Sequence, residues 1–361
     1  MENTGQRMKI QCSQETADLI TEAGKGHWIY QRIDDIASRG GIQTYWVEPQ
    51  SKEQEAKLKN AAPTRVTAKP GPVTNSNRLI DWNVDILKRL LKRVVAYRRD
   101  EQHAGIAAKG KVSPDFAVKV EEGKTVRDEV VDTIELPKYR KDIVKTDPES
   151  IDLGEKVDME LRDFVTTIES LYHENPFHSF KHASNVCTNA HKMLTSIVDG
   201  EMGSRTANPL TQFAVVFSAL IHDVDHAGIS NMQLIKEKPN IAHLYRNKSV
   251  AEQNSVDLAW NLLMDPSYEA LQDTIFSNNE EFKRFRNIVV NVVMATDIFD
   301  KDLNADRTSR WLHAFDVDAR TEQMDAETEA NLKATLIVEH SMQISDIMHC
   351  VQHFHSYARY V

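Results

Sequence analysis

Two clusters of histidine and acidic side chains are the residues of this chain best suited to chemistry. The first is FHSFKHA at residues 177–183, and the second is HDVDHAG at residues 222–228. Both lie in apolar, helix-like sequence, where an unpaired ionisable group is costly to bury unless a metal ion or a substrate compensates it. Imidazole and carboxylate bind zinc, and carboxylate and water also suit magnesium or manganese. The clusters therefore predict a metal site.

The spacing of these residues is compatible with helices that hold them rigidly. His178 and His182 are four residues apart, so they would share one face of a helix. Taken alone, this pair is explained about as well by coincidence as by a site. His222 and Asp223 end the apolar run 213–221, which would place them at the rim of a packed core. Four ionisable groups within five residues beside a buried helix favour a functional interpretation.

Both clusters resemble motifs of the class I cyclic-nucleotide phosphodiesterases. HDVDHAGISN at residues 222–231 is similar to the motif of that family, and residues 177–183 resemble its upstream aromatic-His-Asn-x-x-His-Ala element. Further matches follow in the family's order at residues 249–254, 294–297 and 345–346. Ser179 stands where the family usually has Asn, and residues 253–254 are Gln-Asn in place of Asn-His. The resemblance covers about residues 77–361.

The resemblance implies a set of metal ligands. A first ion, expected to be zinc, would be bound by His182, His222, Asp223 and Asp346. Asp223 would also bridge to a second ion, expected to be magnesium or manganese, whose other ligands are mostly water. Two ions about 3.5–4 Å apart can hold the phosphate oxygens and a bridging hydroxide, and a metal-bound water ionises near neutral pH.

The resemblance also implies the residues that act on the substrate. His178 corresponds to the general acid that protonates the departing 3′ oxygen, a task for which imidazole is suited at neutral pH. Glu252 would orient His178, and His226 would support the hydroxide or the phosphate. His178 and Asp346 are the residues expected at the substrate. Asp225 and residues 296–297 would belong to the surrounding polar network.

Asp346 has the least direct support from the residues themselves. It lies in a helical pattern at residues 337–346, where an exposed acidic residue is an equally good interpretation. The resemblance favours a ligand, because the family places its fourth ligand on a late helix that packs against the histidine helices. His349 and His353 are again four residues apart, but no second carboxylate pairs with them, and we interpret them as surface or packing residues.

The amino-terminal segment, residues 10–47, resembles the end of a class III nucleotidyl cyclase domain. Residues 8–13 predict a short strand, Ser13 begins a predicted helix that extends to Ala23, and residues 39–47 predict a glycine turn into a strand with the family's closing Thr-Tyr-Trp. Only the tail of such a domain is present. Its position in front of the phosphodiesterase sequence suggests a cyclase–phosphodiesterase fusion involved in signal transduction.

Three regions are predicted along the chain. Residues 1–49 are the cyclase remnant, residues 50–76 are a flexible linker rich in Pro, Lys, Glu and Gln, and residues 77–361 are the phosphodiesterase domain. This domain begins with an amphipathic helix at residues 79–97, whose basic face could contact acidic lipid or a partner. We favour the simpler interpretation that this helix is the first of the domain and that its charged face contacts solvent. Residues 102–145 are charged and predicted to be looped or regulatory.

Composition limits the classes of protein to be considered. The 361 residues have a net charge of −10, from 44 basic and 54 acidic residues, which argues against nucleic acid as the main partner. Three separated cysteines predict no disulfide framework and indicate a reducing compartment. No run of 18 apolar residues occurs, and residues 1–9 lack the pattern of a signal peptide. We therefore expect a cytoplasmic location, including as the cytoplasmic part of a membrane receptor in a longer parent protein.

The predicted fold is mainly α: an all-helical phosphodiesterase bundle with a small amino-terminal α/β remnant. The longest stretches of helical periodicity are at residues 79–97, 157–171, 211–221 and 282–295. Only 15 residues follow Asp346, whereas the family binds its purine ring with later helices, so we expect the domain to be incomplete at its carboxyl end.

The predicted activity is metal-dependent hydrolysis of cGMP, cAMP or both to 5′-nucleotides. Two alternatives remain open. One is a non-catalytic, truncated metal-binding fragment. The other is a phosphohydrolase of the HD-domain type, so named for its paired His-Asp ligands, with another phosphate ester as substrate. The presence of His178 and Glu252 beyond the bare ligand set favours the cyclic-nucleotide substrate.

Overall fold

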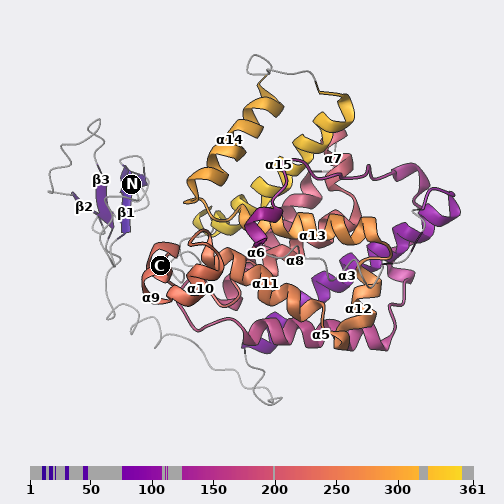
Figure 1. Ribbon diagram of the computed structural model, residues 1–361, viewed down its shortest axis with the longest axis horizontal. Coiled ribbons are helices and arrows are strands. Elements are labelled where there is room, and N and C mark those ends of the chain that lie inside the picture. Colours follow the sequence, from indigo (N-terminus) through magenta and orange to yellow (C-terminus); the bar gives the residue numbers. More distant parts are fainter. Residues whose placement is uncertain are drawn as a thin grey trace. The chain divides into compact units, whose positions relative to one another are not determined.

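A computed structural model gives the structure of the chain. It describes residues 10–13, 16–18, 21, 29–31, 44–47, 75–107, 110, 112, 124–197, 200–316 and 324–351. The chain divides into a smaller unit over residues 1–71 and a larger unit over residues 72–360 (Figure 1). Of the predicted linker, only residues 75–76 are described, and they begin the first helix of the larger unit.

The described part of the smaller unit contains a three-stranded antiparallel sheet. Its strands are β1 (Ile10–Ser13), β2 (Ile29–Gln31) and β3 (Thr44–Val47), in the order β1-β3-β2. Ile10 and Ile29 are both opposite Val47 in the register. The strands predicted near residues 10–13 and 44–47 are confirmed. Residues 16–18 of the predicted helix are helical, and most of its remaining residues lie outside the described ranges.

The regular elements described in the larger unit are helices. Its α-helices are α3 (Asn75–His103), α5 (Glu155–Ser170), α6 (Phe180–Ser196), α7 (Gly200–Thr206), α8 (Pro209–Ile221), α9 (Asn231–Glu237), α10 (Pro239–Leu244), α11 (Val250–Leu263), α12 (Glu269–Ile275), α13 (Asn279–Met294), α14 (Lys301–Phe315) and α15 (Ala326–Ile347). Short 3₁₀ turns are η4 (Val126–Glu129), η5 (Lys141–Ile143), η6 (Pro148–Ser150), η7 (Pro266–Tyr268) and η8 (Met348–Val351). The predicted mainly α fold is confirmed, and the four predicted helices correspond to α3, α5, α8 and α13.

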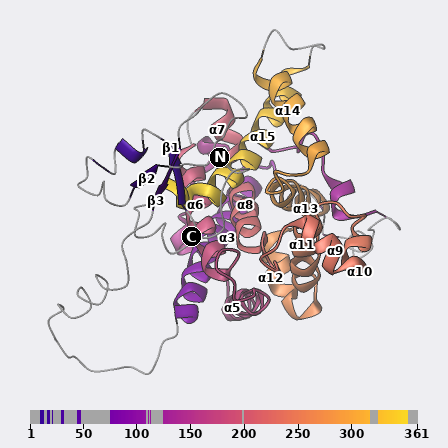
Figure 2. The same ribbon diagram turned by 90° about the vertical axis from the view of Figure 1, so that its left-hand side faces the viewer.

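Helix α8 is the centre of the larger unit. Every residue of this helix is buried, and it contacts α3, α6 and α13 (Figure 2). Its start is well defined by Asn208, whose Oδ1 accepts hydrogen bonds from Leu210 N and Thr211 N, and by Pro209 at the first helical position. A mostly apolar helix that is buried along its whole length must be surrounded on all sides, so α8 fixes the packing of its neighbours and the direction in which its last residues point.

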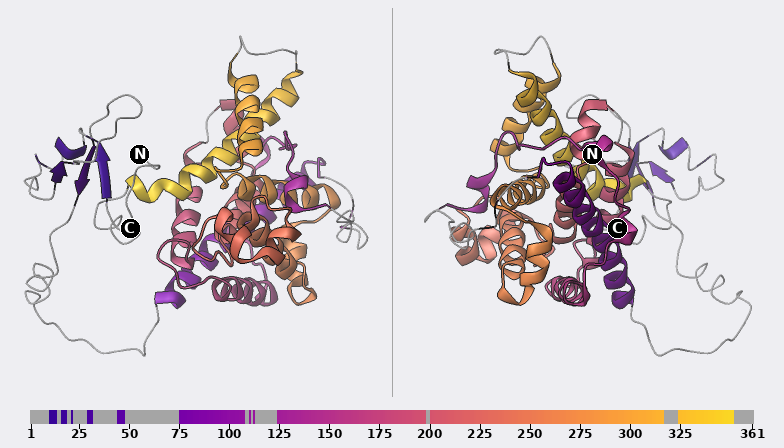
Figure 3. Two further views of the ribbon diagram at one scale, coloured as in Figure 1. Left: turned by 60° about the vertical axis from the view of Figure 1, so that its left-hand side comes forward. Right: turned by 90° about the vertical axis from the view of Figure 1, so that its right-hand side faces the viewer.

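Helix α3 packs along the outside of the larger unit (Figure 3). Its apolar face buries Leu87, Leu90 and Leu91, while basic side chains on the other face form contacts within the same unit. Lys88 Nζ lies 2.6 Å from Asp158 Oδ2, and Arg93 Nη1 donates to Gln212 Oε1 at 2.7 Å. These contacts support the interpretation of α3 as the first helix of the domain. Among the described residues, no helix is long and apolar enough to span a membrane.

Residues 124–136, which include η4 and continue without regular secondary structure, are here called the strap and lie within the region predicted to be looped. The strap buries Val126, Ile134 and Leu136, so its backbone polar groups need partners inside the protein. Side chains of other helices supply them. The strap's backbone N–H groups donate as follows: Arg127 N to Gln253 Oε1 (2.9 Å), Val131 N to Asn291 Oδ1 (3.1 Å), Ile134 N to Thr335 Oγ1 (2.9 Å) and Leu136 N to Asn331 Oδ1 (3.0 Å). The strap is therefore fastened to α11, α13 and α15.

Candidate metal and catalytic site

Three helix ends bring the predicted ligands into position. Ser179 caps the amino terminus of α6, and its Oγ accepts a hydrogen bond from His182 N, which lies in the first turn. Ser179 thus acts as an N-cap at a position where the resembled family has Asn. His222 is the C-cap of α8, Asp223 follows it, and Asp346 lies in the last turn of α15. Because α15 contacts α6 and α8, these ends converge.

The structure brings the four predicted ligands of the first metal ion together. His182 Nε2 lies 2.8 Å from Asp346 Oδ1 and 3.8 Å from Asp223 Oδ2. His222 Nε2 lies 3.2 Å from Asp223 Oδ2 and 3.5 Å from Asp346 Oδ1. Ligand atoms of His182, His222 and Asp346 all lie within 4.8 Å of one another. Their assignment as ligands remains a prediction, but their geometry is that of a group able to surround one cation.

Two atoms at the centre of this group lack hydrogen-bond partners although they are buried. They are Nε2 of His222 and Oδ2 of Asp223. Buried polar atoms are nearly always paired, so an orphan needs an explanation such as an ion. His222 Nδ1 lies 3.0 Å from the Ala219 carbonyl oxygen, which can only accept. In the neutral ring, Nδ1 therefore bears the proton, and the lone pair on Nε2 would be available to a metal ion held between this ring and the carboxylates. This donor set fits a divalent metal ion.

The charges in the group reinforce one another. Burial alone would lower the pKa of His222, but the carboxylates of Asp223 and Asp346 raise it well above its ordinary value. Burial alone would likewise raise the pKa of Asp223, but His222 lowers it to about 2. The pKa of Asp346 is lowered against burial by His182 and His222. Both carboxylates thus stay ionised and offer negative charge to a cation.

Beside the four ligands, His178 and His226 form a stacked pair. Their ring centroids are 3.7 Å apart with 22° between the planes, and ring nitrogens of both lie within 4.8 Å of the Asp223 carboxylate. Burial lowers the pKa of His178 to about 4 and lowers the pKa of His226. Gly228 N donates to His226 Nδ1 at 3.0 Å, so the neutral ring has its proton on Nε2. That N–H is free to donate to an anionic group.

Glu252 does not make the contact predicted for it. Its Oε2 accepts a hydrogen bond from Asn231 Nδ2 at 2.9 Å, and none of the hydrogen bonds described in the structure joins it to His178. Burial and the nearby carboxylate of Asp297 raise the pKa of Glu252 to about 7. Sequence analysis did not single out Asn231 as functional. The available signal was its place as the last residue of the motif at residues 222–231.

The turn between the two histidines of the second motif has an unusual backbone. Asp225 has a φ of +61°, a left-handed conformation that is uncommon for a residue other than glycine. Its carboxylate lies 2.6 Å from His173 Nε2 and accepts a hydrogen bond from Asn254 Nδ2 at 2.9 Å. Asp225 therefore stabilises the turn that separates Asp223 from His226, consistent with a place in the supporting polar network.

Phe177 packs between the predicted ligand His182 and His349. The ring of Phe177 lies 4.4 Å from that of His182 and 5.0 Å from that of His349. His349 Nδ1 lies 3.0 Å from the Asp346 backbone oxygen. His349 is therefore a packing residue at the edge of the site. His353 lies outside the described residues.

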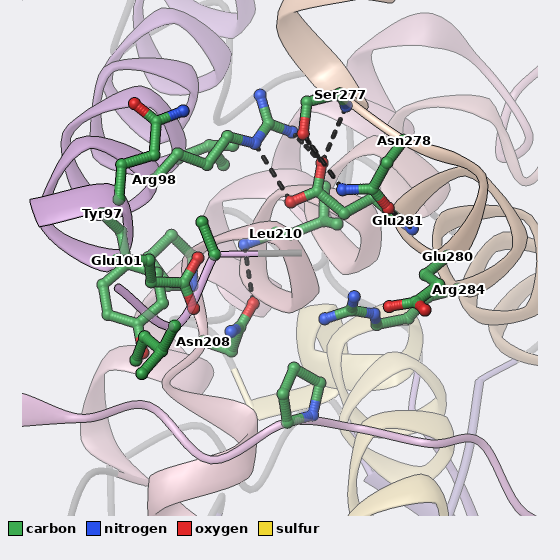
Figure 4. A pocket seen from close by; sticks show the side chains of 16 residues that line it. Tyr97, Arg98, Glu101, Asn208, Leu210, Ser277, Asn278, Glu280, Glu281 and Arg284 are labelled. Carbon is green, nitrogen blue, oxygen red and sulfur yellow. Dashed lines mark hydrogen bonds and ion pairs between the residues drawn. The ribbon is translucent and has the colours of Figure 1, made fainter. Parts of the chain in front are cut away.

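A separate pocket opens at the other end of α8. It has a volume of about 220 Å³ and is lined by residues of α3, by Asn208 and Leu210 at the start of α8, and by Arg98, Glu281 and Arg284 among its charged groups (Figure 4). None of the residues predicted to do chemistry lines this pocket. A search by cavity alone would therefore have pointed away from the histidine clusters.

Comparison with known proteins agrees with these features. The model of the 3′5′-cyclic nucleotide phosphodiesterase family matches residues 177–361, which include both histidine motifs and Asp346. The chain belongs to this family. The four converging residues and the stacked histidine pair thus lie within the part of the chain that defines membership.

Two relatives and one solved structure illustrate the similarity. A human dual specificity calcium/calmodulin-dependent 3′,5′-cyclic nucleotide phosphodiesterase 1C is 35% identical over 143 residues, 38% of this chain. A probable 3′,5′-cyclic-AMP phosphodiesterase of Caenorhabditis elegans is 33% identical over 135 residues, 37% of the chain. The matched region spans 19% of each relative. The phosphodiesterase domain of Salpingoeca rosetta rhodopsin phosphodiesterase matches with a TM-score of 0.46 and 24% identity, over 56% of each chain.

Proposed function

We propose that this chain hydrolyses 3′,5′-cyclic nucleotides, cGMP, cAMP or both, to 5′-nucleotides in a metal-dependent reaction. The observation that supports this most directly is the pair of orphaned atoms, His222 Nε2 and Asp223 Oδ2, inside the group completed by His182 and Asp346. Family membership supplies the substrate class, and the relatives named above are cyclic-nucleotide phosphodiesterases.

The proposed cofactors are two divalent ions, zinc with magnesium or manganese. His182, His222, Asp223 and Asp346 would hold the first ion, and Asp223 would contribute to the second. When bound, such a pair neutralises phosphate charge and lowers the pKa of an attacking water. The ionised carboxylates of Asp223 and Asp346 hold negative charge in the site before any substrate arrives, so an anionic phosphodiester alone would be repelled from it.

His178 is the proposed proton donor to the 3′ oxygen that leaves when the ring opens. Its ring is stacked on that of His226, which fixes the plane of both. Two positive rings at 3.7 Å would repel each other, so only one of the pair can be protonated at a time. The His226 ring, with its proton on Nε2, can donate a hydrogen bond to the phosphate. The negative phosphodiester counteracts the burial that lowers the pKa of His178, and so favours its acidic form.

The layout of the chain is part of the proposal. Residues 1–49 are proposed to be the end of a nucleotidyl cyclase domain, residues 50–76 a linker, and residues 77–361 the phosphodiesterase domain. The strands at residues 10–13 and 44–47 are compatible with this assignment for the smaller unit. A fusion of this kind would act in the cytoplasm, where a cyclic nucleotide is both formed and degraded.

The test is hydrolysis of cAMP and cGMP by the purified 361-residue chain, with metal content measured on the same sample. The proposal expects 5′-nucleotide formation and bound zinc, with both lost in His222→Ala. Lys181→Ala, at an exposed position next to His182 in the first turn of α6, is the control and should retain both. Bound metal without turnover would favour a non-catalytic fragment. Hydrolysis of other phosphate esters alone would favour the HD-type alternative.

A further inference from the structure

One side-chain amide joins the carboxylates of Glu252 and Asp297, and Glu252 lies near enough to Asp223 of the proposed site for that carboxylate to contribute to its raised pKa. Asn231 Nδ2 donates to Glu252 Oε2 at 2.9 Å and to Asp297 Oδ2 at 3.3 Å. Its Oδ1 accepts a hydrogen bond from Ala251 N at 2.9 Å. Asn231 begins α9, Glu252 lies in the first turn of α11, and Asp297 follows α13. The amide therefore ties together three elements whose relative positions decide where Glu252 lies.

The two carboxylates depend on this amide. Asp297 is buried, with 5% of its surface exposed, and it is the first charged group to raise the pKa of Glu252. Like charges at short range disfavour each other, and a donor shared between them offsets part of that cost. If Asn231 lost its N–H donor, Glu252 would lose its described side-chain donor, Asp297 would keep only the donors to its other oxygen, and the two carboxylates would move apart.

The second oxygen of Asp297 continues the network towards the strap. Asp297 Oδ1 accepts hydrogen bonds from Phe299 N at 2.9 Å and from Asp300 N at 3.1 Å. The carboxylate of Asp300 in turn receives both arms of the Arg127 guanidinium, at 2.8 and 3.2 Å, and Ser249 Oγ at 3.2 Å. A continuous path of hydrogen bonds thus leads from the strap to Glu252.

The strap holds the same turn of α11 through a second contact. Arg127 N donates to Gln253 Oε1 at 2.9 Å, and Gln253 Nε2 donates to Lys248 O at 2.7 Å. Gln253 is fully buried and directly follows Glu252 in the sequence. The backbone N–H of Arg127 therefore holds the turn that bears Glu252, and the side chain of Arg127 holds the turn that bears Asp297.

We propose that Asn231 is a positioning residue for the phosphodiester reaction, and that Arg127 of the strap supports it through Asp300 and Asp297. The amide holds Glu252 and Asp297 as one unit beside the histidine cluster, and displacement of the strap loosens that unit. This inference rests on the proposed function, because its effect is read as turnover of cyclic nucleotide. The strap would then contribute to catalysis, although it supplies no metal ligand.

Asn231→Asp is the sharpest variant, because it keeps the shape of the side chain and replaces the donor with a third carboxylate. It should lower kcat by about 10- to 100-fold, the usual effect of removing a group that orients a catalytic residue. KM should stay within about threefold of the wild type, and bound zinc should be unchanged, because no ligand is altered. A residue that only fills space would tolerate this isosteric change.

Arg127→Gln tests the same network from the strap, and remains informative if Asn231→Asp fails to fold. Its matched control is Arg286→Gln, which removes another two-bond arginine–carboxylate pair on the same strap, from Arg286 to Glu129 at 2.8 and 2.7 Å. Both variants should lower the Tm. Only Arg127→Gln should also lower kcat, by about 3- to 30-fold, and Arg127→Lys should recover part of the loss because it keeps the charge without the fork.

The outcomes separate this inference from the proposed function. A wild-type chain without cyclic-nucleotide turnover would overturn both. An active wild type with unchanged kcat in folded Asn231→Asp, or with equal kcat in Arg127→Gln and Arg286→Gln, would overturn the positioning network alone. Loss of zinc from either network variant would also overturn it, because the effect would then act through the metal ligands.

Discussion

The two ends of α8 both gather charged residues but treat them differently. At its start, Arg98 at the 220 Å³ pocket donates to Thr274 O at 2.6 Å and to Glu281 Oε1 at 3.1 Å, and Glu281 also accepts from Ser277 N at 2.8 Å. At its end, His222 Nε2 and Asp223 Oδ2 are buried 3.2 Å apart and form no hydrogen bond. The charged side chains named at the start are satisfied, although Thr211 Oγ1 in the first turn lacks a hydrogen-bond partner among the described residues, whereas the two atoms named at the end are unsatisfied. The comparison shows that the pocket and the cluster able to surround a cation lie at opposite ends of the same helix, and that the cluster is distinguished by the types of its side chains.

The largest effect should come from Asp223→Ala, at the unsatisfied end. This carboxylate lies 3.2 Å from His222 Nε2 and also belongs to the group with His178 and His226, so its loss affects both proposed cation sites. We expect hydrolysis and metal binding to disappear together. Metal analysis and a cyclic-nucleotide assay on one preparation check this. Retention of either property would show that Asp223 is not shared between the two sites.

His178→Ala should separate catalysis from metal binding. His178 lies outside the group of His182, His222 and Asp346, so bound zinc should remain. Turnover should fall by about 10²- to 10⁴-fold if the residue is the general acid. Steady-state kinetics with metal analysis measure this. Full activity, or metal loss as complete as in Asp223→Ala, would contradict the proposed role.

At the satisfied end, Arg98→Met should change stability without changing activity. The variant removes bonds to Thr274, Ile275 and Glu281 and leaves the Glu281 carboxylate short of a partner. The cost should be about 1–3 kcal/mol of unfolding free energy. Urea unfolding and the hydrolysis assay together provide the test. A large loss of kcat in the folded variant would mean that the two ends of α8 are coupled.

The smallest effect concerns pH at the same end. Burial alone would raise the pKa of Glu281, but Arg98 and the Ser277 N–H lower it. A carboxyl group with a lowered folded pKa stabilises the protein above its unfolded value of about 4.3, and that contribution is lost as the pH falls through the folded pKa. The Tm of the wild type should therefore fall more steeply than that of Arg98→Met as the pH decreases below about 4.3. The exposed pair of Arg140 and Asp142 is the control: Arg140 also lowers the pKa of Asp142, but solvent screens this pair, so Arg140→Met should change the slope less than Arg98→Met does.

Much of the fold, and the residues that converge at the predicted metal site, could be predicted from sequence because the signals are local. The apolar run at residues 213–221 predicts α8, and the motifs on either side of it identify His182, His222 and Asp223. Asp346 needed the family resemblance, since nothing in its own helix distinguishes it from an exposed acidic residue. The sequence motifs are therefore sufficient to predict which residues are candidates. Whether those residues converge depends on how α15 packs against α6.

The contacts of Glu252 and of the strap could not be predicted from local sequence patterns. Glu252 was predicted to contact His178, but its described partner is Asn231, which is 21 positions away in sequence. The strap was predicted only as a charged, looped region, because the side chains that pair with its backbone belong to helices more than 100 residues downstream. Which amide meets which carboxylate is decided by packing of distant helices, and no periodicity in the chain encodes it.

The measurement that tests the central claim most directly is a zinc titration of the metal-stripped chain, in the presence of magnesium, with cyclic-nucleotide hydrolysis recorded at each step. If the orphaned atoms of His222 and Asp223 face a required cation, activity should be absent at the start and should rise to a plateau at one zinc ion per chain. The same titration of His222→Ala should remain flat. Full hydrolysis by the metal-stripped chain, or an unchanged titration in His222→Ala, would contradict the account.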